Sequence, residues 1–367
     1  MLPSSIKNLR GGLLCGILTM SSLAAQETIS VAMEVPDMTS YIYAPGLGGG
    51  PVLIGKYCTY YEAPTGEIIK GTTGGNILGN GKAISTVTFA EIDTKLTRSW
   101  YNDWYYQSVR APFAGWMFKK RFGIEVEKQP NHEVSFYNYG FKLNCINIGQ
   151  EKDITCLRTV FAEHTDKFGP ETEQIVLVGD SRGAATTFNF MALDHPNISC
   201  AILEGIFDSM PHVITHLRYH HSIFCFFKQA TLASLLKKVA GSYSHEGPFP
   251  IDYVKEFPYD TPVLMVTSLT DEIVPHECTM NLYIKLLQSG HTNVRLLILP
   301  CSRHDGYMLQ QDKDRYEQCV HAFYRSCGVD HDLLLAEQGE AILAETQPSV
   351  DEIRRNYLDC KSTKYRS

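Results

Sequence analysis

A serine-centred motif is the strongest chemical signal in this chain. The run Gln174–Ala185 reads QIVLVGDSRGAA, so an apolar stretch leads directly into Gly179-Asp180-Ser181-Arg182-Gly183 and then into a helix-compatible segment. This is the G-x-S-x-G pattern in a strand–turn–helix setting, where the flanking glycines allow a sharp turn that exposes the serine hydroxyl. The N-terminus of the following helix favours a developing negative charge. The pattern predicts that Ser181 is a nucleophile.

A serine hydroxyl becomes an effective nucleophile only with a base that takes its proton and a carboxylate that orients the base. Two downstream residues suit these roles, because each follows an apolar run that is typical of a buried strand. Asp271 follows PVLMVTSLT, and His304 follows VRLLILPCSR. We expect His304 to be the base and Asp271 to be the orienting acid.

Other interpretations of these residues stay open at this level. Asp271 could instead cap a helix that begins near Val274, and His304 could be an ordinary loop histidine. Asp208 lies just after the apolar run AILEG and competes for the acid role, because the carboxylate has only to reach the imidazole in space. Asp305 is adjacent to His304 in the chain and is therefore poorly placed to orient its ring.

The elements that must position these residues alternate between apolar runs and helix-compatible segments. This alternation predicts an α/β protein with a mostly parallel, doubly wound sheet, because the runs IVLV, AILE, VLMV and LLIL are too continuously apolar for half-exposed strands. The expected strands are 39–44, 133–139, 174–178, 200–203, 262–267 and 294–299. The expected helices are 151–167, 183–193, 276–289 and 312–326.

Ser181 in GDSRG, Asp271 in SLTDEIVP and His304 in SRHDGY, with the strands before them, resemble the catalytic half of the α/β-hydrolase superfamily. The resemblance covers residues 39–50 and 133–326. The sequence around Asp271 and His304 is similar in style to secreted esterases, dienelactone hydrolases and prolyl-oligopeptidase-type catalytic domains. It implies an α/β-hydrolase sheet with a helical cap insertion, and acyl transfer through a serine acyl-enzyme. One departure is an aspartate directly after the histidine, where a glycine or apolar residue is more usual.

The oxyanion hole of this superfamily combines the N–H of the residue after the nucleophile with an N–H from the loop after an earlier strand. Arg182 would supply the first. For the second, Pro45-Gly46-Leu47-Gly48-Gly49 resembles the family's His-Gly-x-Gly loop, with Leu47 as the donor. Tyr139-Gly140-Phe141 is the alternative, although the residues after Gly140 read like the loop and helix that precede the motif strand.

The first 25 residues have the pattern of a secretory signal peptide. Lys7 and Arg10 form a small positive region, a short apolar run follows, and Ala24 and Ala25 close it. The apolar run of about 15 residues falls short of the ~20 that a membrane span needs. We therefore expect a secreted or periplasmic protein.

The rest of the chain divides into a hydrolase domain at 26–330 and a polar helical tail at 331–367. Two insertions enlarge the domain. The first, at 59–130, is rich in glycine and aromatic residues, which more often pack a segment onto the body of a protein than line a cleft. The second, at 206–260, is the expected cap.

Two parts of the cap could bind something other than the substrate. His212, His216 and His220 recur at i, i+4 and i+8, as zinc ligands can, but the glutamate of H-E-x-x-H is missing and we interpret them as a solvated helix face. Ser222–Gly241 combines IFCFF with three lysines. It could be an amphipathic lid that touches lipid, but a cap helix buried over the pocket is the preferred interpretation.

Composition limits the class of protein. The chain has 367 residues, is 44% hydrophobic and carries a formal net charge of -7. It can therefore bury a large core, and its acidic balance argues against nucleic-acid binding. Eleven cysteines are too sparse for a disulfide scaffold. If Cys15 leaves with the signal peptide, the ten that remain permit disulfides but specify no pairing, and nothing here sets the oligomeric state.

Together these features predict a serine hydrolase that cleaves a carboxylic ester or related acyl bond in a small or lipid-like substrate. The chemistry requires no cofactor, and we assign no metal site. A serine peptidase or amidase that uses the same three residues is the nearest alternative. A non-catalytic binding protein that keeps the fold is the other, with the aromatic segment 100–118 as its contact surface.

Overall fold

The computed structural model describes residues 39–44, 46, 51–53, 59–62, 68–71, 83–86, 148–168, 174–220, 231, 234, 243–304, 306–307 and 310–358. All of them lie within the unit Met38–Ser367. The expected signal peptide, the expected strand 133–139, the tryptophan-rich segment 100–118 and most of Ser222–Gly241 lie outside the described residues.

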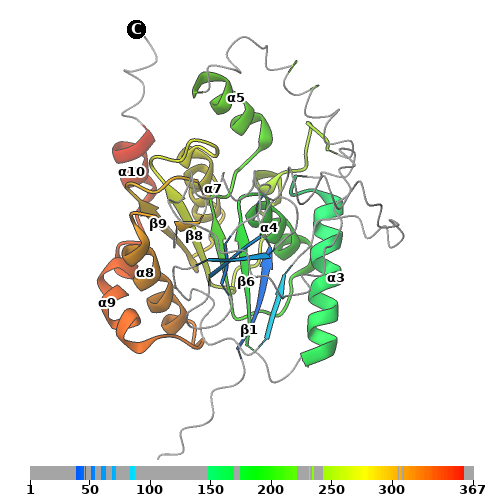
Figure 1. Cartoon of the computed structure of the whole chain (residues 1–367). Coiled ribbons are helices and arrows are strands. Elements are labelled where there is room, and N and C mark those ends of the chain that lie inside the picture. The colour runs from blue at the N-terminus through cyan, green and yellow to red at the C-terminus, as the bar shows by residue number, and fades with distance from the viewer. Residues whose placement is uncertain are drawn as a thin grey trace, which may run out of the picture. The chain divides into compact units, whose positions relative to one another are not determined.

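A six-stranded sheet forms the centre of the protein, with every neighbouring pair of strands parallel. Its order across the sheet is β5 (Ala83–Thr86), β1 (Thr39–Ala44), β6 (Gln174–Asp180), β7 (Cys200–Glu204), β8 (Val263–Ser268) and β9 (Val294–Leu299), as Figure 1 shows in part. Because β1 lies between β5 and β6, the direction in which strands are added reverses at the β1–β6 pair. In open parallel sheets, ligands bind at the carboxyl ends of the strands at such a reversal.

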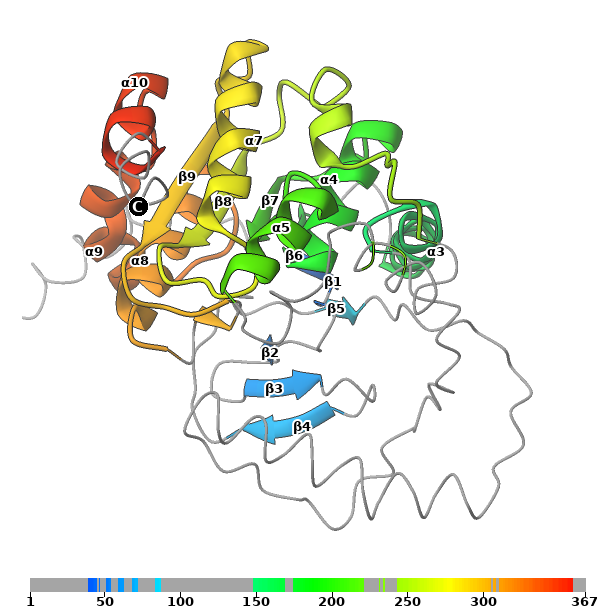
Figure 2. The same ribbon diagram turned by 90° about the horizontal axis from the view of Figure 1, so that it is seen from above.

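Helices cover both faces of this sheet, and alternate strand residues face opposite sides. One face packs against α3 (Glu151–Phe168), α4 (Arg182–Asp194) and α7 (His276–Gln288), and its buried strand residues include Ile42, Leu177, Leu203 and Met265. The other face packs against α8 (Lys313–Ser326) and α9 (Leu333–Ala344) through residues such as Tyr43, Val178, Ile202 and Val266 (Figure 2). Because helices shield both faces of the sheet from water, the strand sequences are continuously apolar.

The expected elements within the described residues agree with the observed bounds to within two residues. The largest difference is at β6, which continues past the expected end at 178 and carries the strand into Asp180. Strand β5 was not expected, because Ala83–Thr86 lies inside the segment 59–130 that we read as an insertion. Four residues reading AIST give no sustained apolar pattern. That segment also contributes to a separate antiparallel sheet of β2 (Pro51–Leu53), β3 (Thr59–Glu62) and β4 (Ile68–Gly71).

Within the expected tail 331–367, residues 333–344 and 350–358 are helical, and part of this helical segment is buried. Helix α9 lies so close to α8 that a Cβ at Gly339 would overlap the Gln318 carbonyl oxygen, which explains the glycine. Exposed ion pairs such as Arg325–Glu340, at 3.0 Å, add about 0.2–1 kcal/mol each. After α9 come α10 (Val350–Ile353), which begins with a capping box, and a π-helical turn (Arg354–Leu358). The Ile353 side chain is fully buried.

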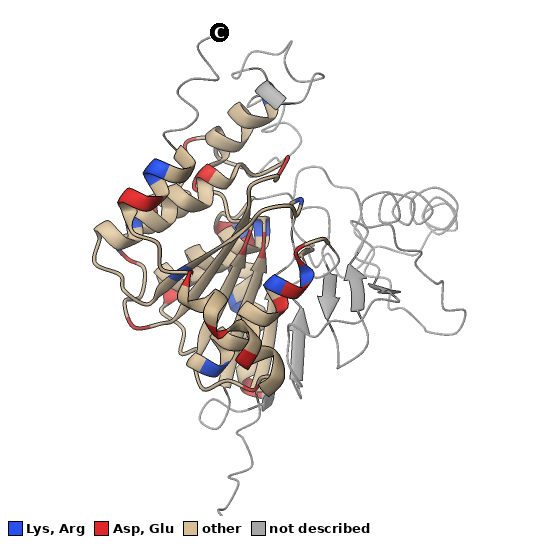
Figure 3. Ribbon diagram, turned by 90° about the vertical axis from the view of Figure 1, so that its left-hand side faces the viewer, with Lys and Arg blue, Asp and Glu red and all other residues tan. Residues whose placement is uncertain are grey.

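The expected cap is described in two pieces, which contain α5 (Met210–His220) and the short 3-10 helix η3 (Pro250–Tyr253). Acidic and basic residues are interspersed along the described helices (Figure 3). Within the ranges given above, no helix has both the length and the apolar character that crossing a membrane requires.

Candidate active site

Ser181 occupies the sharp turn between β6 and α4, at the switch point of the sheet. Its backbone has φ 53° and ψ -107°, a region that non-glycine residues rarely adopt. Two hydrogen bonds hold this conformation: the Ser181 N–H donates to the Glu204 carbonyl at 2.7 Å, and the Ala185 N–H donates to the Ser181 carbonyl at 3.1 Å. A Cβ at Gly179 would lie 2.7 Å from Ala184 Cα, so the first glycine of the motif is required sterically.

Ser181, His304 and Asp271 form one continuous hydrogen-bonded chain. The His304 Nε2 lies 2.8 Å from the Ser181 hydroxyl oxygen, and the His304 Nδ1 lies 2.7 Å from Asp271 Oδ2. All three residues are buried, with exposed fractions of 8% or less. The carboxylate can only accept, so the Nδ1 carries the hydrogen and Nε2 is left as the acceptor for the serine proton. The structure therefore brings together the three residues that the sequence proposed.

Asp271 does not cap α7, which begins at His276 and has no side-chain capping bond. Its Oδ1 instead accepts hydrogen bonds from the backbone N–H groups of Ile273 and Val274 in the preceding turn, each at 2.8 Å. Its Oδ2 contacts the imidazole. The backbone bonds fix the plane of the carboxylate, so that the second oxygen is held toward His304.

The loops that carry Asp271 and His304 are tied to each other. The Ser302 carbonyl accepts from the Thr270 hydroxyl at 2.6 Å and also from the Ser268 hydroxyl. The Ser302 hydroxyl in turn donates to Asp312, at the start of α8, at 2.8 Å. These bonds couple the ends of β8 and β9 independently of the imidazole.

The backbone at Gly205 forms a wall against the His304 ring. Gly205 has φ +55°, and a Cβ there would lie 3.0 Å from His304 Cε1. Any side chain would therefore push the ring away from its two partners.

Gly46, which lies just after β1, is close to Ser181. A Cβ at Gly46 would lie 3.3 Å from Ser181 Cβ and 3.2 Å from an Asp180 carboxylate oxygen. Leu47, the proposed second donor, and the alternative Tyr139-Gly140-Phe141 lie outside the described residues. Arg182, the proposed first donor, is the first residue of α4, where backbone N–H groups have no acceptor within the helix.

The Arg182 side chain makes a buried ion pair that the sequence did not reveal. Its guanidinium donates twice to Asp153 of α3, at 2.7 and 2.5 Å, and Asp153 also accepts from the Gly149 N–H at 2.8 Å. The side chains are 8% and 2% exposed. The pair ties the residue after the nucleophile to a neighbouring helix.

Glu204, at the end of β7, is a buried acid that contacts the turn at Ser181. Its carbonyl accepts the Ser181 N–H, and its carboxylate accepts the hydroxyl of Tyr316 from α8. Burial, together with the neighbouring carboxylate, raises the pKa of Tyr316 well above its ordinary value, so the hydroxyl stays a donor. The only sequence signal for Glu204 is that a charged residue ends an otherwise apolar strand.

Asp208, the competing acid, does not contact His304 in the structure. Its carboxylate lies 3.0 and 3.1 Å from the Nδ1 of His212 instead. Asp305 lies outside the described residues.

Comparison with known proteins found no matching family model and no matching curated sequence. Among solved structures, an esterase of Pyrococcus furiosus aligns at 15% identity and TM-score 0.37, over 48% of this chain and 62% of that one. An acylaminoacyl peptidase of Pyrococcus horikoshii aligns at 14% identity and TM-score 0.46, over 82% of this chain and 39% of that one. Est1E from Butyrivibrio proteoclasticus aligns at 16% identity and TM-score 0.34, over 48% of this chain and 69% of that one.

The architecture itself identifies the fold. The sheet is parallel and covered on both faces, and the serine lies on a strained turn between a strand and a helix. The serine, the acid and the histidine follow β6, β8 and β9 in the chain order of one superfamily. The protein has the α/β-hydrolase fold.

Proposed function

We propose that this protein is a serine hydrolase that cleaves a carboxylic ester. The observation that carries the proposal is the hydrogen-bonded chain from the Ser181 hydroxyl through His304 to Asp271, at 2.8 and 2.7 Å. A binding protein that merely kept the fold would have no need to hold these three groups in proton-transfer geometry. The first residue of this hydrogen-bonded series, Ser181, has a strained backbone, and backbone strain is concentrated at functional sites.

In the proposed reaction, the Ser181 oxygen attacks the ester carbonyl while His304 Nε2 takes the hydroxyl proton. The imidazolium that forms is stabilised by Asp271 through Nδ1. The proton then passes to the leaving alkoxide as the carbon–oxygen bond breaks, which leaves an acyl-serine. Water repeats the cycle: His304 takes its proton, the acid is released, and the serine recovers its hydrogen.

The negative charge on the tetrahedral intermediate would be stabilised by the backbone N–H groups of Arg182 and Leu47. The position of Arg182 at the start of α4 and the closeness of Gly46 to Ser181 support this assignment. Each donor of this kind contributes about 3 kcal/mol to lowering the barrier.

Labelling with a fluorophosphonate probe tests the nucleophile. We expect the wild-type protein to be labelled at Ser181, the Ser181→Ala variant to be unlabelled, and labelling of His304→Ala to be strongly slowed. Ser326→Ala is the matched control, because Ser326 is exposed and far along the chain in α8. Labelling that persists in Ser181→Ala would exclude the assignment.

The choice between an ester and an amide bond needs a separate measurement. A panel of chromogenic esters and peptide amides with matched acyl groups should give turnover of the esters in preference to the amides, and turnover should vanish in Ser181→Ala. Faster turnover of the amides would instead make the protein a serine peptidase or amidase.

We also propose that the chain is exported. The charged, apolar and small-residue order of residues 1–25 supports this. N-terminal sequencing of the protein from culture should find a mature chain that begins near Gln26, whereas an intracellular chain that begins at Met1 would contradict export.

A further inference from the structure

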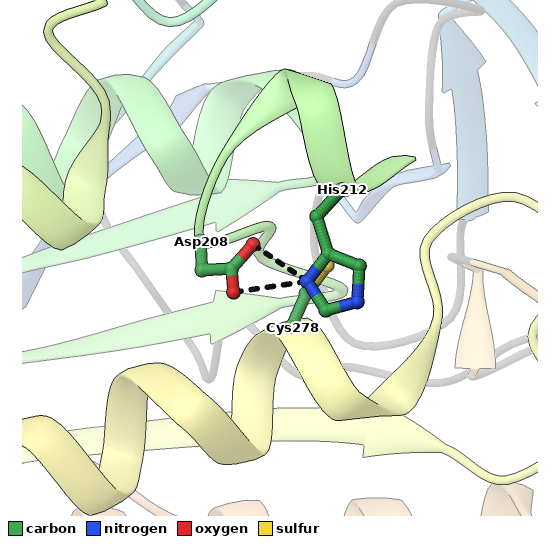
Figure 4. A group of neighbouring side chains, drawn as sticks. All are labelled: Asp208, His212 and Cys278. Carbon is green, nitrogen blue, oxygen red and sulfur yellow. Dashed lines mark hydrogen bonds and ion pairs between the residues drawn. The ribbon is translucent and has the colours of Figure 1, made fainter. Parts of the chain in front are cut away.

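Three side chains of metal-ligating type meet on the cap side of the sheet, outside the proposed triad. Asp208 follows β7, His212 lies in α5, and Cys278 lies in α7. Their ligand atoms all lie within 4.8 Å of one another. Figure 4 shows the imidazole and the carboxylate turned toward each other, with Cys278 beside them.

The backbone around these side chains is held by hydrogen bonds that do not involve them. The Thr279 hydroxyl donates to the Ile206 carbonyl at 2.8 Å, which fixes α7 against the loop that carries Asp208. The Ile251 N–H donates to the Asp208 carbonyl at 3.2 Å. The three groups are therefore brought together by the fold, and a ligand would not have to organise them.

The donor set is one oxygen, one nitrogen and one sulfur. Hard cations such as Ca²⁺ and Mg²⁺ prefer oxygen alone, whereas Zn²⁺ accepts carboxylate, imidazole and thiolate together. Tetrahedral zinc places its ligand atoms roughly 3.3–3.6 Å apart. The Nδ1 of His212 lies 3.0 Å from the nearer Asp208 oxygen, so small side-chain adjustments would reach that geometry.

Exposure is graded across the cluster. Cys278 is fully buried and the Asp208 side chain is 10% exposed, but the His212 side chain is 33% exposed. An ion would therefore reach the site from the His212 side, and water would complete the coordination of the three ligands that the described residues supply.

Two polar side chains donate hydrogen bonds to the Asp208 carboxylate and could orient it as a metal ligand. The Asn281 side-chain amide donates to Asp208 Oδ2 at 3.4 Å, and the Ser209 hydroxyl donates to Oδ1 at 3.3 Å. Such donors orient a carboxylate ligand without competing for the metal.

We propose that Asp208, His212 and Cys278 bind one zinc ion, which fastens α5, the first helix of the expected cap, to α7. On binding, the Cys278 thiol releases its proton to solvent. The His212 ring also gives up the Nδ1 proton that it donates to Asp208, so that the neutral ring carries its hydrogen on Nε2 and coordinates through Nδ1. The ion takes no part in the Ser181 chemistry. In this proposal one histidine of the i, i+4, i+8 pattern, His212, is a ligand, and its partners are distant in the sequence.

Metal titration of the full chain tests this site. The purified protein would be stripped with a chelator and titrated with Zn²⁺ by calorimetry, with bound metal counted by mass spectrometry. We expect one zinc ion per chain, with affinity at least 100-fold weaker in His212→Ala and in Cys278→Ser. His216→Ala is the matched control, because it lies one turn further along the same helix and outside the cluster. Its affinity should equal that of the wild type.

Cobalt substitution keeps the proposal falsifiable if a variant fails to fold. The wild-type protein with Co²⁺ should show thiolate-to-cobalt charge-transfer absorption, together with a rise in melting temperature. Zinc affinity that is unchanged in His212→Ala and Cys278→Ser, or a cobalt spectrum without the thiolate band, would overturn the proposal. So would a stripped protein that binds no zinc.

Discussion

The ion pair between Asp153 and Arg182 lies directly behind the nucleophile turn, and the two partners should respond unequally to replacement. Asp153→Asn leaves a guanidinium that cannot lose its proton in a site where its side chain is only 8% exposed. Removing one partner of a buried pair costs about 3–5 kcal/mol of unfolding free energy. We expect Asp153→Asn to fall in that range.

Arg182→Met should cost less, because the partner that remains can neutralise itself. Burial raises the pKa of the Asp153 carboxyl, while the guanidinium and the Gly149 N–H lower it. Once Arg182 is gone, the carboxyl can take up a proton, and the cost falls to that of a poorly satisfied polar group, about 1–3 kcal/mol. A raised pKa in the folded state means that stability is retained at low pH. The Arg182→Met deficit should therefore grow as pH rises above about 4, the ordinary pKa of an aspartate.

Urea denaturation, followed by circular dichroism, would give the free energy of unfolding of each single variant and of the double variant Asp153→Asn/Arg182→Met. The double variant should lose much less than the sum of the two single losses, because neither member of the pair remains without the other. Asp153→Asn should also lower kcat with little change in KM, because the Arg182 N–H is a proposed oxyanion donor. The fall in kcat should be no larger than the 10²–10³-fold that losing one such donor costs. Strictly additive losses, or an Arg182→Met variant less stable than Asp153→Asn at neutral pH, would refute this reasoning.

Three further substitutions and one control probe the geometry of the proposed triad. Asp271→Asn should lower ester kcat by about 10³–10⁴-fold, because an amide no longer selects the required imidazole tautomer; a loss below tenfold would contradict this. Gly205→Ala should lower both stability and kcat, since its Cβ meets the His304 ring, whereas Gly328→Ala, with φ +70° and open space, should lower stability alone. Gly46→Ala, whose Cβ would lie 3.3 Å from that of the nucleophile, should reduce kcat without a comparable loss in denaturant midpoint.

The positions of Ser181, Asp271 and His304 could be predicted because they depend on rules that act locally. Each follows a buried parallel strand, and the carboxyl ends of parallel strands meet at one edge of the sheet. A continuous apolar run shows where such a strand ends to within a residue or two. For β8 and β9 this sufficed to place Asp271 and His304 in neighbouring loops.

The buried polar partners could not be predicted, because they depend on how helices pack. Asp153 lies in the first turn of α3, where an acidic residue is ordinary, and nothing local links it to Arg182 in the next helix. Asp208 and Cys278 are likewise joined only by the docking of α7 beside the end of β7. Strand β5 escaped prediction for a different reason, since Ala83–Thr86 is too short to show a period.

Each of the three residues of the proposed triad is held by backbone contacts in addition to its contacts with the other two. Ser181 is fixed through Glu204, Asp271 through Ile273 and Val274, and the His304 ring lies against Gly205. Two of these anchors are backbone groups of the consecutive residues Glu204 and Gly205 at the end of β7, and the third is the backbone that follows Asp271, so removing the Ser181 side chain leaves all three in place. Replacing Ser181 should therefore leave the bond between His304 and Asp271 intact, and the loss of activity in such a variant would measure the missing hydroxyl rather than a collapsed site.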